Sequence, residues 1–168
     1  LDIGAGAGCH SRELQRLGIN VTAIDISPAA VDFMLSEGIN AKNTNILNLQ
    51  EGTFQTIVLL MNGLGLAGTL SNMPDFLKHL KSLLSPNGKI LCDSADIKYM
   101  YEDEEGAVWI DLNAAYYGEM QFDMHYKDVS SGWFSWIYID QITLKECCDT
   151  AGLSCEIIFE GENNHYLA

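Results

Sequence analysis

The 168-residue sequence predicts an α/β fold with a mainly parallel sheet that carries helices on both faces. Three observations predict this fold class. Residues 1–8 read as the end of a buried strand that runs into a glycine turn, which is how a parallel strand enters its helix. A helix, a glycine and a short apolar strand then alternate along the chain, and such alternation builds a parallel sheet covered by helices. The strand segments are apolar throughout, as expected for strands buried on both faces.

The glycine turn has the sequence Leu1-Asp2-Ile3-Gly4-Ala5-Gly6-Ala7-Gly8. Because glycine has no Cβ, it lets the backbone pass close to a ligand and bend sharply into a helix. Asp25 ends the next predicted strand, where an acidic side chain suits a ribose diol. Together these features predict a site for a nucleotide-like cofactor. A dinucleotide site would show Gly-x-Gly-x-x-Gly, whereas here Gly8 comes one residue early and Cys9 stands where the third glycine would be.

The predicted helices carry recognisable start and stop signals. Ser27 can cap a helix whose first turn tolerates Pro28. Residues 73–84 place their apolar side chains on one stripe, which predicts an amphipathic helix. A capping box over residues 143–146 opens a further helix that ends near Gly152.

The predicted strands lie between these helices. Three segments rich in Ile, Leu or Val are assigned as strands: Val21 to Asp25, Phe54 to Leu60 and Lys89 to Asp93. Glycines just past helix ends can take the left-handed conformation before the chain enters the sheet, as at Gly18, Gly38 and Gly152. A related turn is predicted over residues 85–88.

The pattern changes after Asp96, where aromatic and polar residues are mixed. Residues 97–140 are predicted to form an antiparallel β insertion after the fifth strand. Its expected extended segments are Ala107 to Leu112, Tyr117 to Lys127 and Trp133 to Ile139, with a hairpin turn at Ser130-Ser131-Gly132. The aromatic side chains suggest the wall of a substrate pocket, and a surface ribbon without a ligand role is the alternative.

Composition excludes several classes of partner. The net charge of −14, with only nine Lys and Arg, argues against nucleic acid, because binding phosphates requires clustered basic residues. Apolar runs are too short to span a bilayer, and no signal-peptide pattern is present, so we expect no membrane partner. Five cysteines without Cys-x-x-Cys spacing predict reduced thiols, a cytoplasmic location and no metal site. The oligomeric state cannot be predicted.

At the glycine turn and the second strand, the sequence resembles the class I S-adenosylmethionine-dependent methyltransferases. Their first motif is similar to residues 1–8, and their acidic second-strand motif is similar to Ala23-Ile24-Asp25-Ile26-Ser27. The resemblance covers residues 1 to about 95 and about 141 to 168 of the printed sequence. It implies a Rossmann-like fold with an antiparallel final strand near Tyr166, S-adenosyl-L-methionine as cofactor, and a pocket-covering role for the insertion. Residues 1–168 are expected to be one core domain with both ends truncated relative to the family.

The resemblance also implies binding roles, position by position. Asp2 corresponds to the carboxylate that holds the methionine amino end, and residues 4–6 lie backbone-first against the cofactor. Asp25 would accept hydrogen bonds from both ribose hydroxyls. Structural roles are the alternatives, since Asp2 can tie down the loop and Asp25 can be a strand-end turn residue. The predicted cofactor contacts are Asp2, Gly4, Ala5, Gly6, Asp25, Ile26, Asn45, Ile46, Met61 and Asn62.

Two of these assignments depart from the family pattern or have a plain alternative. Many relatives place an acidic residue where this chain has Asn45, whose amide oxygen can still accept from the adenine amino group. Met61 and Asn62 follow the fourth strand, where the family lines the methyl-donor end of the pocket. Asn62 as a turn residue without a ligand is the alternative.

The catalytic residue is unknown from sequence. Holding the reactants of a methyl displacement in attack geometry can supply about 7 to 11 kcal/mol, whereas a general base adds only about 10² to 10⁴ in rate. The candidates are His10, Tyr99 and His125. The resemblance therefore implies a methyltransferase that acts on a small molecule, with a protein side chain as the second choice of acceptor. A noncatalytic cofactor-binding module of the same fold and a dinucleotide-dependent oxidoreductase are the alternatives.

Overall fold

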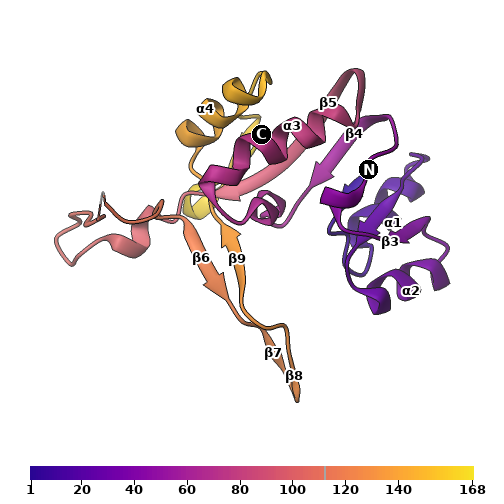
Figure 1. Cartoon of the computed structure of the whole chain (residues 1–168), viewed down its shortest axis with the longest axis horizontal. Helices are drawn as coiled ribbons and strands as arrows, with labels where there is room; N and C mark the ends of the chain where they lie inside the picture. The colour runs from indigo at the N-terminus through magenta and orange to yellow at the C-terminus, as the bar shows by residue number, and fades with distance from the viewer. Residues whose placement is uncertain (112) are drawn as a thin grey trace. The chain divides into compact units, whose positions relative to one another are not determined.

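The computed structural model describes residues 1–111 and 113–168 (Figure 1). The chain divides into two compact units. The N-terminal unit comprises Leu1–Leu60 and His79–Leu91, and the C-terminal unit comprises Met61–Lys78 and Cys92–Ala168. Among the described residues, no helix has the length and apolar character that a membrane span needs.

The N-terminal unit contains a parallel sheet. Its strands are β1 (Asp2–Ile3), β2 (Ala23–Asp25), β3 (Ala41–Asn43), β4 (Phe54–Leu59) and the first part of β5 (Leu84–Ala95), in the order β5-β4-β1-β2-β3. The pairs β1–β2, β1–β4 and β2–β3 are all parallel. The predicted α/β fold with a mainly parallel sheet is confirmed.

Helices α1 (Cys9–Arg16) and α2 (Pro28–Ser36) connect these strands, and the 3₁₀ turn η1 (Ile46–Asn48) follows β3. The predicted start of α2 is confirmed, because the Ser27 hydroxyl accepts a hydrogen bond from the Ala30 N–H at 3.3 Å. Helix α2 closes a small core against β2 and β3, whose buried members are Ala23, Val31, Met34, Ile39 and Ala41.

The glycines predicted to end helices have left-handed backbones, with φ of 81° at Gly18, 76° at Gly38 and 70° at Gly152. The prediction of a separate turn over residues 85–88 is wrong, because these residues belong to β5, which begins at Leu84. Asn87 nevertheless keeps a left-handed backbone with φ of 62°. The side-chain amide of Asn tolerates this conformation, so the bend is accommodated within the strand.

The C-terminal unit begins with short 3₁₀ turns, η2 (Gly63–Ala67) and η3 (Leu70–Asn72), which lead into α3 (Met73–Ser82). The predicted helix over residues 73–84 is thus confirmed, with its end two residues earlier. Near the C-terminus, η5 (Glu162–Asn164) separates β10 (Phe159–Glu160) from β11 (His165–Leu167). Strand β11 pairs antiparallel with both β5 and β10, which confirms the predicted antiparallel interior strand near Tyr166.

Helix α4 (Gln141–Ala151) begins two residues before the predicted capping box. The N-cap is Asp140, whose Oδ1 accepts from the N–H groups of Ile142 at 2.9 Å and Thr143 at 3.0 Å. The Thr143 hydroxyl instead donates to Asp140 Oδ2 at 2.6 Å. The assignment of Thr143 as the cap was wrong because the carboxylate three residues earlier takes the free N–H groups.

As predicted, the insertion contains two antiparallel strand pairs, and it also contains the 3₁₀ turn η4 (Lys98–Tyr101). Strands β6 (Glu119–Phe122) and β9 (Phe134–Ile137) lie side by side and continue into the hairpin of β7 (His125–Tyr126) and β8 (Val129–Ser130) (Figure 1). The predicted strand near Ala107 to Leu112 reduces to an isolated bridge between Val108 and Glu102, and Leu112 lies outside the described residues.

The predicted hairpin turn at residues 130–132 was wrong. The chain reverses at Lys127-Asp128, since Tyr126 pairs with Val129, and Lys127 takes the left-handed φ of 51°. The serines hold the junction between the two strand pairs. Ser131 accepts from the Met124 N–H through its hydroxyl at 2.8 Å, and its own N–H donates to the Met124 carbonyl at 2.9 Å.

Candidate functional site

The glycine turn joins β1 to α1 through three left-handed residues, with φ of 68° at Gly4, 55° at Gly6 and 76° at Gly8. A Cβ at Gly8 would fall 2.6 Å from Ile39 Cδ1 and 2.9 Å from Met34 Cγ, so packing requires glycine there. No atom lies within 4 Å of the corresponding position at Gly6. The turn therefore offers bare backbone and open space at Gly6, where a ligand can approach closely.

Asp25 joins the second strand to the glycine turn. Its Oδ2 accepts from the Gly6 N–H and its Oδ1 from the Ser27 N–H, both at 2.8 Å. The side chain is only partly buried. A carboxylate has about four acceptor positions, so two remain for ribose hydroxyls after these bonds are made. The geometry accommodates both interpretations of Asp25, a turn-holding residue and a ribose acceptor.

Asp2 lies in the core of the N-terminal unit with 2% of its surface exposed. Its Oδ2 accepts from the hydroxyl of Ser11, a buried residue of α1, at 2.6 Å. This bond anchors the helix that follows the turn, which is the structural alternative considered above. A contact with the methionine amino group stays a prediction.

The predicted adenine contacts lie beyond the ends of β2 and β3. Ile26 is 71% exposed, so its side chain is accessible to a ligand. Asn45 Oδ1 already accepts from the Leu47 N–H at 2.9 Å, which caps η1. Ile46 is buried, and its carbonyl lies 2.8 Å from His79 Nε2. The oxygen of Asn45 retains one lone pair for a further donor.

Met61 and Asn62 belong to the C-terminal unit, whereas the other eight predicted cofactor contacts belong to the N-terminal unit. Both have left-handed backbones, with φ of 62° and 58°. Asn62 is 7% exposed, donates through Nδ2 to the Ile137 carbonyl at 3.2 Å, and accepts from the Ser94 hydroxyl at 2.7 Å. Its side chain therefore fastens the insertion to β5. Met61, at 79% exposed, is the one of the two whose side chain is accessible.

The three catalytic candidates occupy different places. His10 lies exposed on α1, and His125 lies on β7 with Nε2 at 3.1 Å from Asp123 Oδ2. Tyr99 lines a hollow in the C-terminal unit. The structure thus brings Tyr99 alone of the three to a described cavity.

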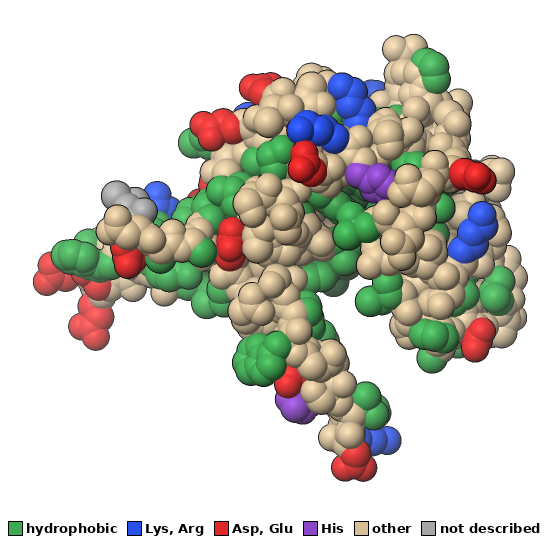
Figure 2. All heavy atoms as spheres, viewed as in Figure 1, with side chains coloured by type: hydrophobic (Ala, Val, Ile, Leu, Met, Phe, Trp, Pro, Cys, Tyr) green, Lys and Arg blue, Asp and Glu red, His purple; other side chains and the backbone are tan. Residues whose placement is uncertain are grey.

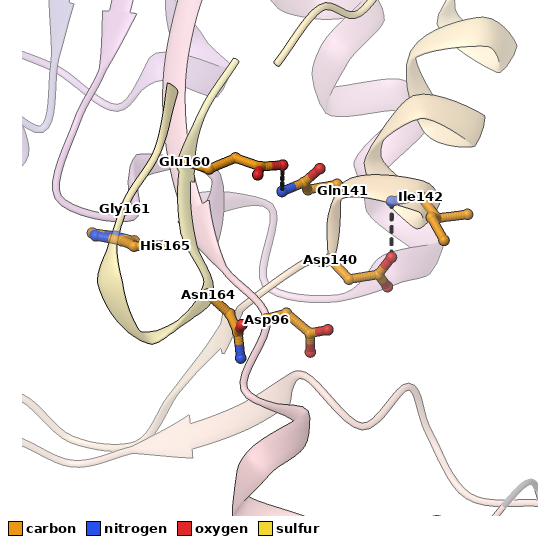
Figure 3. A pocket seen from close by; sticks show the side chains of 8 residues that line it. All are labelled: Asp96, Asp140, Gln141, Ile142, Glu160, Gly161, Asn164 and His165. Carbon is orange, nitrogen blue, oxygen red and sulfur yellow. Dashed lines mark hydrogen bonds between the residues drawn. The ribbon is translucent and has the colours of Figure 1, made fainter. Parts of the chain in front are cut away.

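Two hollows of about 360 Å³ each flank the carboxyl end of β5, and His165 lines both. We call them the methionine–aromatic hollow and the acidic hollow. The walls of the methionine–aromatic hollow include Ile97, Tyr99, Met100, Met120, Phe122 and Tyr138. The acidic hollow is lined by Asp96, Asp140 and Glu160 together with Gln141, Asn164 and His165 (Figure 3).

A hydrogen-bonded network surrounds the acidic hollow. The Tyr117 hydroxyl donates to Asp96 Oδ1 and the Tyr116 hydroxyl to Asp140 Oδ2, both at 2.7 Å. Burial, together with hydrogen bonds to carboxylates, raises the pKa of both tyrosines above the ordinary value. Burial alone would raise the pKa of Asp140, but hydrogen bonds from Thr143 and Tyr116 hold it below its ordinary value. The Tyr116 hydroxyl is therefore a fixed donor that helps to keep the Asp140 carboxylate charged.

Sequence reasoning missed the polar residues of the C-terminal unit. Asp93 and Asp96 stand at the carboxyl end of a predicted strand, and ligands of parallel sheets bind at such ends, so this position was a usable signal. His165 had no comparable local signal. It reaches the site because β11 inserts beside β5, pairing His165 with Ala95.

A glycine turn between a parallel strand and a helix, held by a carboxylate from the next strand, defines an α/β protein with a nucleotide-type cofactor site. Residues 1–156 match the protein-family profile described as a methyltransferase domain. The chain belongs to that family, the S-adenosylmethionine-dependent methyltransferases.

Solved structures share the fold. A SAM-dependent methyltransferase from Bacteroides fragilis, crystallised with S-adenosyl-L-homocysteine, is 44% identical with a TM-score of 0.91, over 99% of this chain and 68% of that one. The CcbJ methyltransferase from Streptomyces caelestis is 14% identical with a TM-score of 0.70, over 99% of this chain and 80% of that one. At this identity the second likeness concerns the fold alone.

A curated relative is the mitochondrial ubiquinone biosynthesis O-methyltransferase of Schizosaccharomyces pombe. It is 31% identical over 97 residues, which are 54% of this chain and 35% of that protein. The match thus spans about a third of the relative's length.

Proposed function

We propose that the chain binds S-adenosyl-L-methionine at its glycine turn and transfers the methyl group to a small-molecule acceptor. The observation that carries the proposal is the glycine turn, in which Gly6 offers open space beside its backbone while Asp25 holds the turn with acceptor positions to spare. The similar Bacteroides fragilis methyltransferase, crystallised with S-adenosyl-L-homocysteine, supports the choice of cofactor.

The residues that would hold the cofactor supply distinct interactions. Residues 4–6 present backbone, Asp25 accepts from the ribose, and Ile26 and Asn45 contact the adenine. Asp2 contributes to the methionine end. When bound, the cofactor supplies an electrophilic methyl group on a positively charged sulfur, so the main task of the protein is to hold the acceptor in line.

A small acceptor is favoured over a macromolecule by charge and by size. The net charge of −14 opposes binding to nucleic acid, and hollows of about 360 Å³ fall within the range of small-molecule sites. The family match runs through both units, which supports treating residues 1–168 as one domain with 97–140 as its insertion. The five free cysteines support a reducing, cytoplasmic location.

Calorimetry on the full chain tests the cofactor assignment. We expect S-adenosylhomocysteine to bind and NAD not to bind. Asp25→Ala removes the ribose acceptor. The variant should therefore bind S-adenosylhomocysteine less tightly by about 1.5 to 3 kcal/mol, the range for hydrogen bonds to a charged group. Asp32→Ala, an exposed carboxylate on α2, is the matched control and should leave the affinity unchanged. Equal affinity in wild type and a folded Asp25→Ala variant would refute the role of Asp25.

A further inference from the structure

Asp93 links two turns of the C-terminal unit. Its Oδ1 accepts from the Asn62 N–H at 2.8 Å, and its Oδ2 lies 3.5 Å from His165 Nε2. The carboxylate is largely buried, whereas the imidazole is about half exposed. An arrangement in which a fixed carboxylate faces one ring nitrogen orients the imidazole and leaves Nδ1 as the nitrogen that can accept a proton.

Both turns that meet at Asp93 have left-handed backbones at non-glycine residues. They are Met61 and Asn62 on one side, and Asn163 and Asn164, directly before His165, on the other. Such conformations cost free energy and persist only where the surrounding structure holds them. The Asn164 carbonyl is held by the Asp96 N–H at 3.1 Å, which fixes the entry of the chain into His165. His165 is therefore a positioned side chain, and it is tied through Asp93 to the turn of Met61 and Asn62.

The methionine–aromatic hollow that His165 lines is suited to an apolar body. Three aromatic rings and two thioethers form much of its wall, and the polar side chains Glu162, Asn163 and His165 stand together on it. Aromatic faces and thioethers are adaptable surfaces that also attract cations. A cavity of this size holds a molecule with a single ring and a short arm.

The charged side chains that line the two hollows, apart from His165 itself, are all carboxylates. The two hollows it shares are lined by the carboxylates Asp96, Asp140, Glu160 and Glu162, and no Lys or Arg is among their described lining residues. An acceptor that arrives as an anion would be repelled by this field, whereas an ammonium ion would be attracted. The product of methylating an amine is again a cation, which the same carboxylates favour.

From these observations we propose that the methionine–aromatic hollow binds a primary amine carried on an apolar ring, and that His165, oriented by Asp93, is the general base that takes the ammonium proton. The proposal rests on the proposed methyl transfer and names its acceptor class. His165 Nδ1 forms a bond to the departing proton, and the N–H electron pair stays on the amine nitrogen. That pair forms the new N–C bond as the C–S bond breaks, so the cofactor leaves as a neutral thioether and the amine keeps one positive charge.

Binding is tested with 2-phenylethylamine and with 2-phenylethanol, its neutral counterpart of nearly the same shape. Calorimetry on the full chain with S-adenosylhomocysteine present should show the amine bound at least tenfold more tightly than the alcohol. Glu162→Gln should reduce the preference for the amine, and Phe122→Ala should weaken both compounds by tenfold or more. Neither variant should alter S-adenosylhomocysteine affinity. Equal binding of amine and alcohol, or no binding of the amine, refutes the acceptor class.

The base is tested with His165→Gln and Asp93→Asn, using formation of S-adenosylhomocysteine from S-adenosylmethionine and 2-phenylethylamine. We expect kcat to fall 10² to 10⁴-fold in His165→Gln with little change in KM, and the rising limb of the wild-type pH profile of kcat to disappear. Asp93→Asn keeps an acceptor for the Asn62 N–H. It should therefore lower kcat less than His165→Gln does, and it should shift the rising limb of the pH profile of kcat. Asp93 lies beside His165, and Tyr99, Tyr138 and Glu162 line the methionine–aromatic hollow with it, whereas Figure 3 shows the imidazole directed away from Asp96 and Asp140 of the acidic hollow.

The outcomes separate this proposal from the proposed function. Absence of S-adenosylhomocysteine binding in the wild type would refute the proposed function itself. Normal cofactor binding with an unchanged pH profile in His165→Gln would refute the role of His165 alone. If His125→Gln removed the rising limb instead, the base would be the other histidine that lies beside a carboxylate, on β7.

Discussion

Gly6 and Gly8 share a left-handed backbone but differ in what lies beside them. Gly8 packs against side chains of the N-terminal core, whereas Gly6 faces open space and donates its N–H to Asp25. The same residue type thus serves packing at one position and ligand approach at the other. A substitution that adds only one methyl group can separate these roles.

Gly8→Ala should lower the free energy of unfolding by about 2 to 4 kcal/mol, since it adds overpacking to the strain of a left-handed alanine. Gly6→Ala should cost only about 1 to 2 kcal/mol, yet weaken S-adenosylhomocysteine at least tenfold because its methyl group enters the ligand's space. Gly18→Ala is the control, because Gly18 has φ of 81° and also faces open space but lies at the far end of α1. In denaturant unfolding, Gly18→Ala should lose about as much stability as Gly6→Ala. In calorimetry, it should bind S-adenosylhomocysteine with the affinity of the wild type. Equal cofactor affinity in the Gly6 and Gly18 variants would contradict the model of the turn.

The residues of the site could be predicted where their signal is local. The glycine turn and Asp25 are recognised from spacing alone, because one βαβ unit delivers both. Asn62 shows the limit of such reasoning, since its side chain is committed to Ser94 and to the carbonyl of Ile137, 75 positions away. His165 and Asp93 meet only through pairing of the last strand with β5, which no local pattern reveals.

Among the elements, α4 depends most on a single side chain. Asp140 caps the helix through Oδ1 and binds the hydroxyls of Thr143 and Tyr116 through Oδ2. The sequence predicted the helix but placed its start at Thr143, because a capping box is visible in sequence whereas the hydrogen bond from Tyr116 is not. The hairpin turn was misplaced for a similar reason, since the serines at 130–131 bond to Met124 and Asp123 across the strands.

Asp140→Ala should lower the free energy of unfolding at pH 7 by about 1.5 to 3 kcal/mol, the sum of a lost N-cap and the lost acceptor of the part-buried Tyr116 hydroxyl. The pKa of Asp140 is depressed in the folded protein. Its charged form therefore contributes stability that is present above the unfolded pKa of about 3.9 and is lost as the pH falls through the folded value. Asp140→Asn should accordingly be less stable than wild type at pH 7, with the difference closing below about pH 4.

Urea unfolding between pH 3 and pH 7 measures this difference. Asp149→Asn, an exposed carboxylate on the same helix, is the control and should change stability by less than about 0.5 kcal/mol. A gap between wild type and Asp140→Asn that stays constant down to pH 3 would show that the charge of Asp140 contributes nothing.

At the scale of the whole chain, the insertion has two parts with different roles. Its base belongs to the core of the C-terminal unit, because Ile137 and Ile139 are fully buried and the Tyr166 hydroxyl donates to the Ile139 carbonyl at 2.6 Å. Its distal hairpin instead exposes hydrophobic side chains to solvent, as Figure 2 shows on the projecting arm. They are Met124, Tyr126, Val129 and Trp133. The boundary of the insertion at residues 97–140, drawn from composition, therefore does not mark a removable segment.

Two excisions test this division. Phe122 and Phe134 are directly paired, so an Asn-Gly turn can replace residues 123–133 without changing the register of β6 and β9. This variant should keep a cooperative thermal transition within a few degrees of wild type and bind S-adenosylhomocysteine with an affinity within twofold of wild type. It should also keep 2-phenylethylamine binding, since Met120 and Phe122 remain.

Replacing residues 97–140 by a short turn should instead abolish cooperative unfolding, because it removes two buried isoleucines worth about 2 to 5 kcal/mol each and leaves the Tyr166 hydroxyl without its acceptor. Circular dichroism melts and calorimetry decide the matter. Loss of amine binding in the folded short excision would place the acceptor on the hairpin, and a cooperative transition in the long excision would show that the insertion is dispensable to the core.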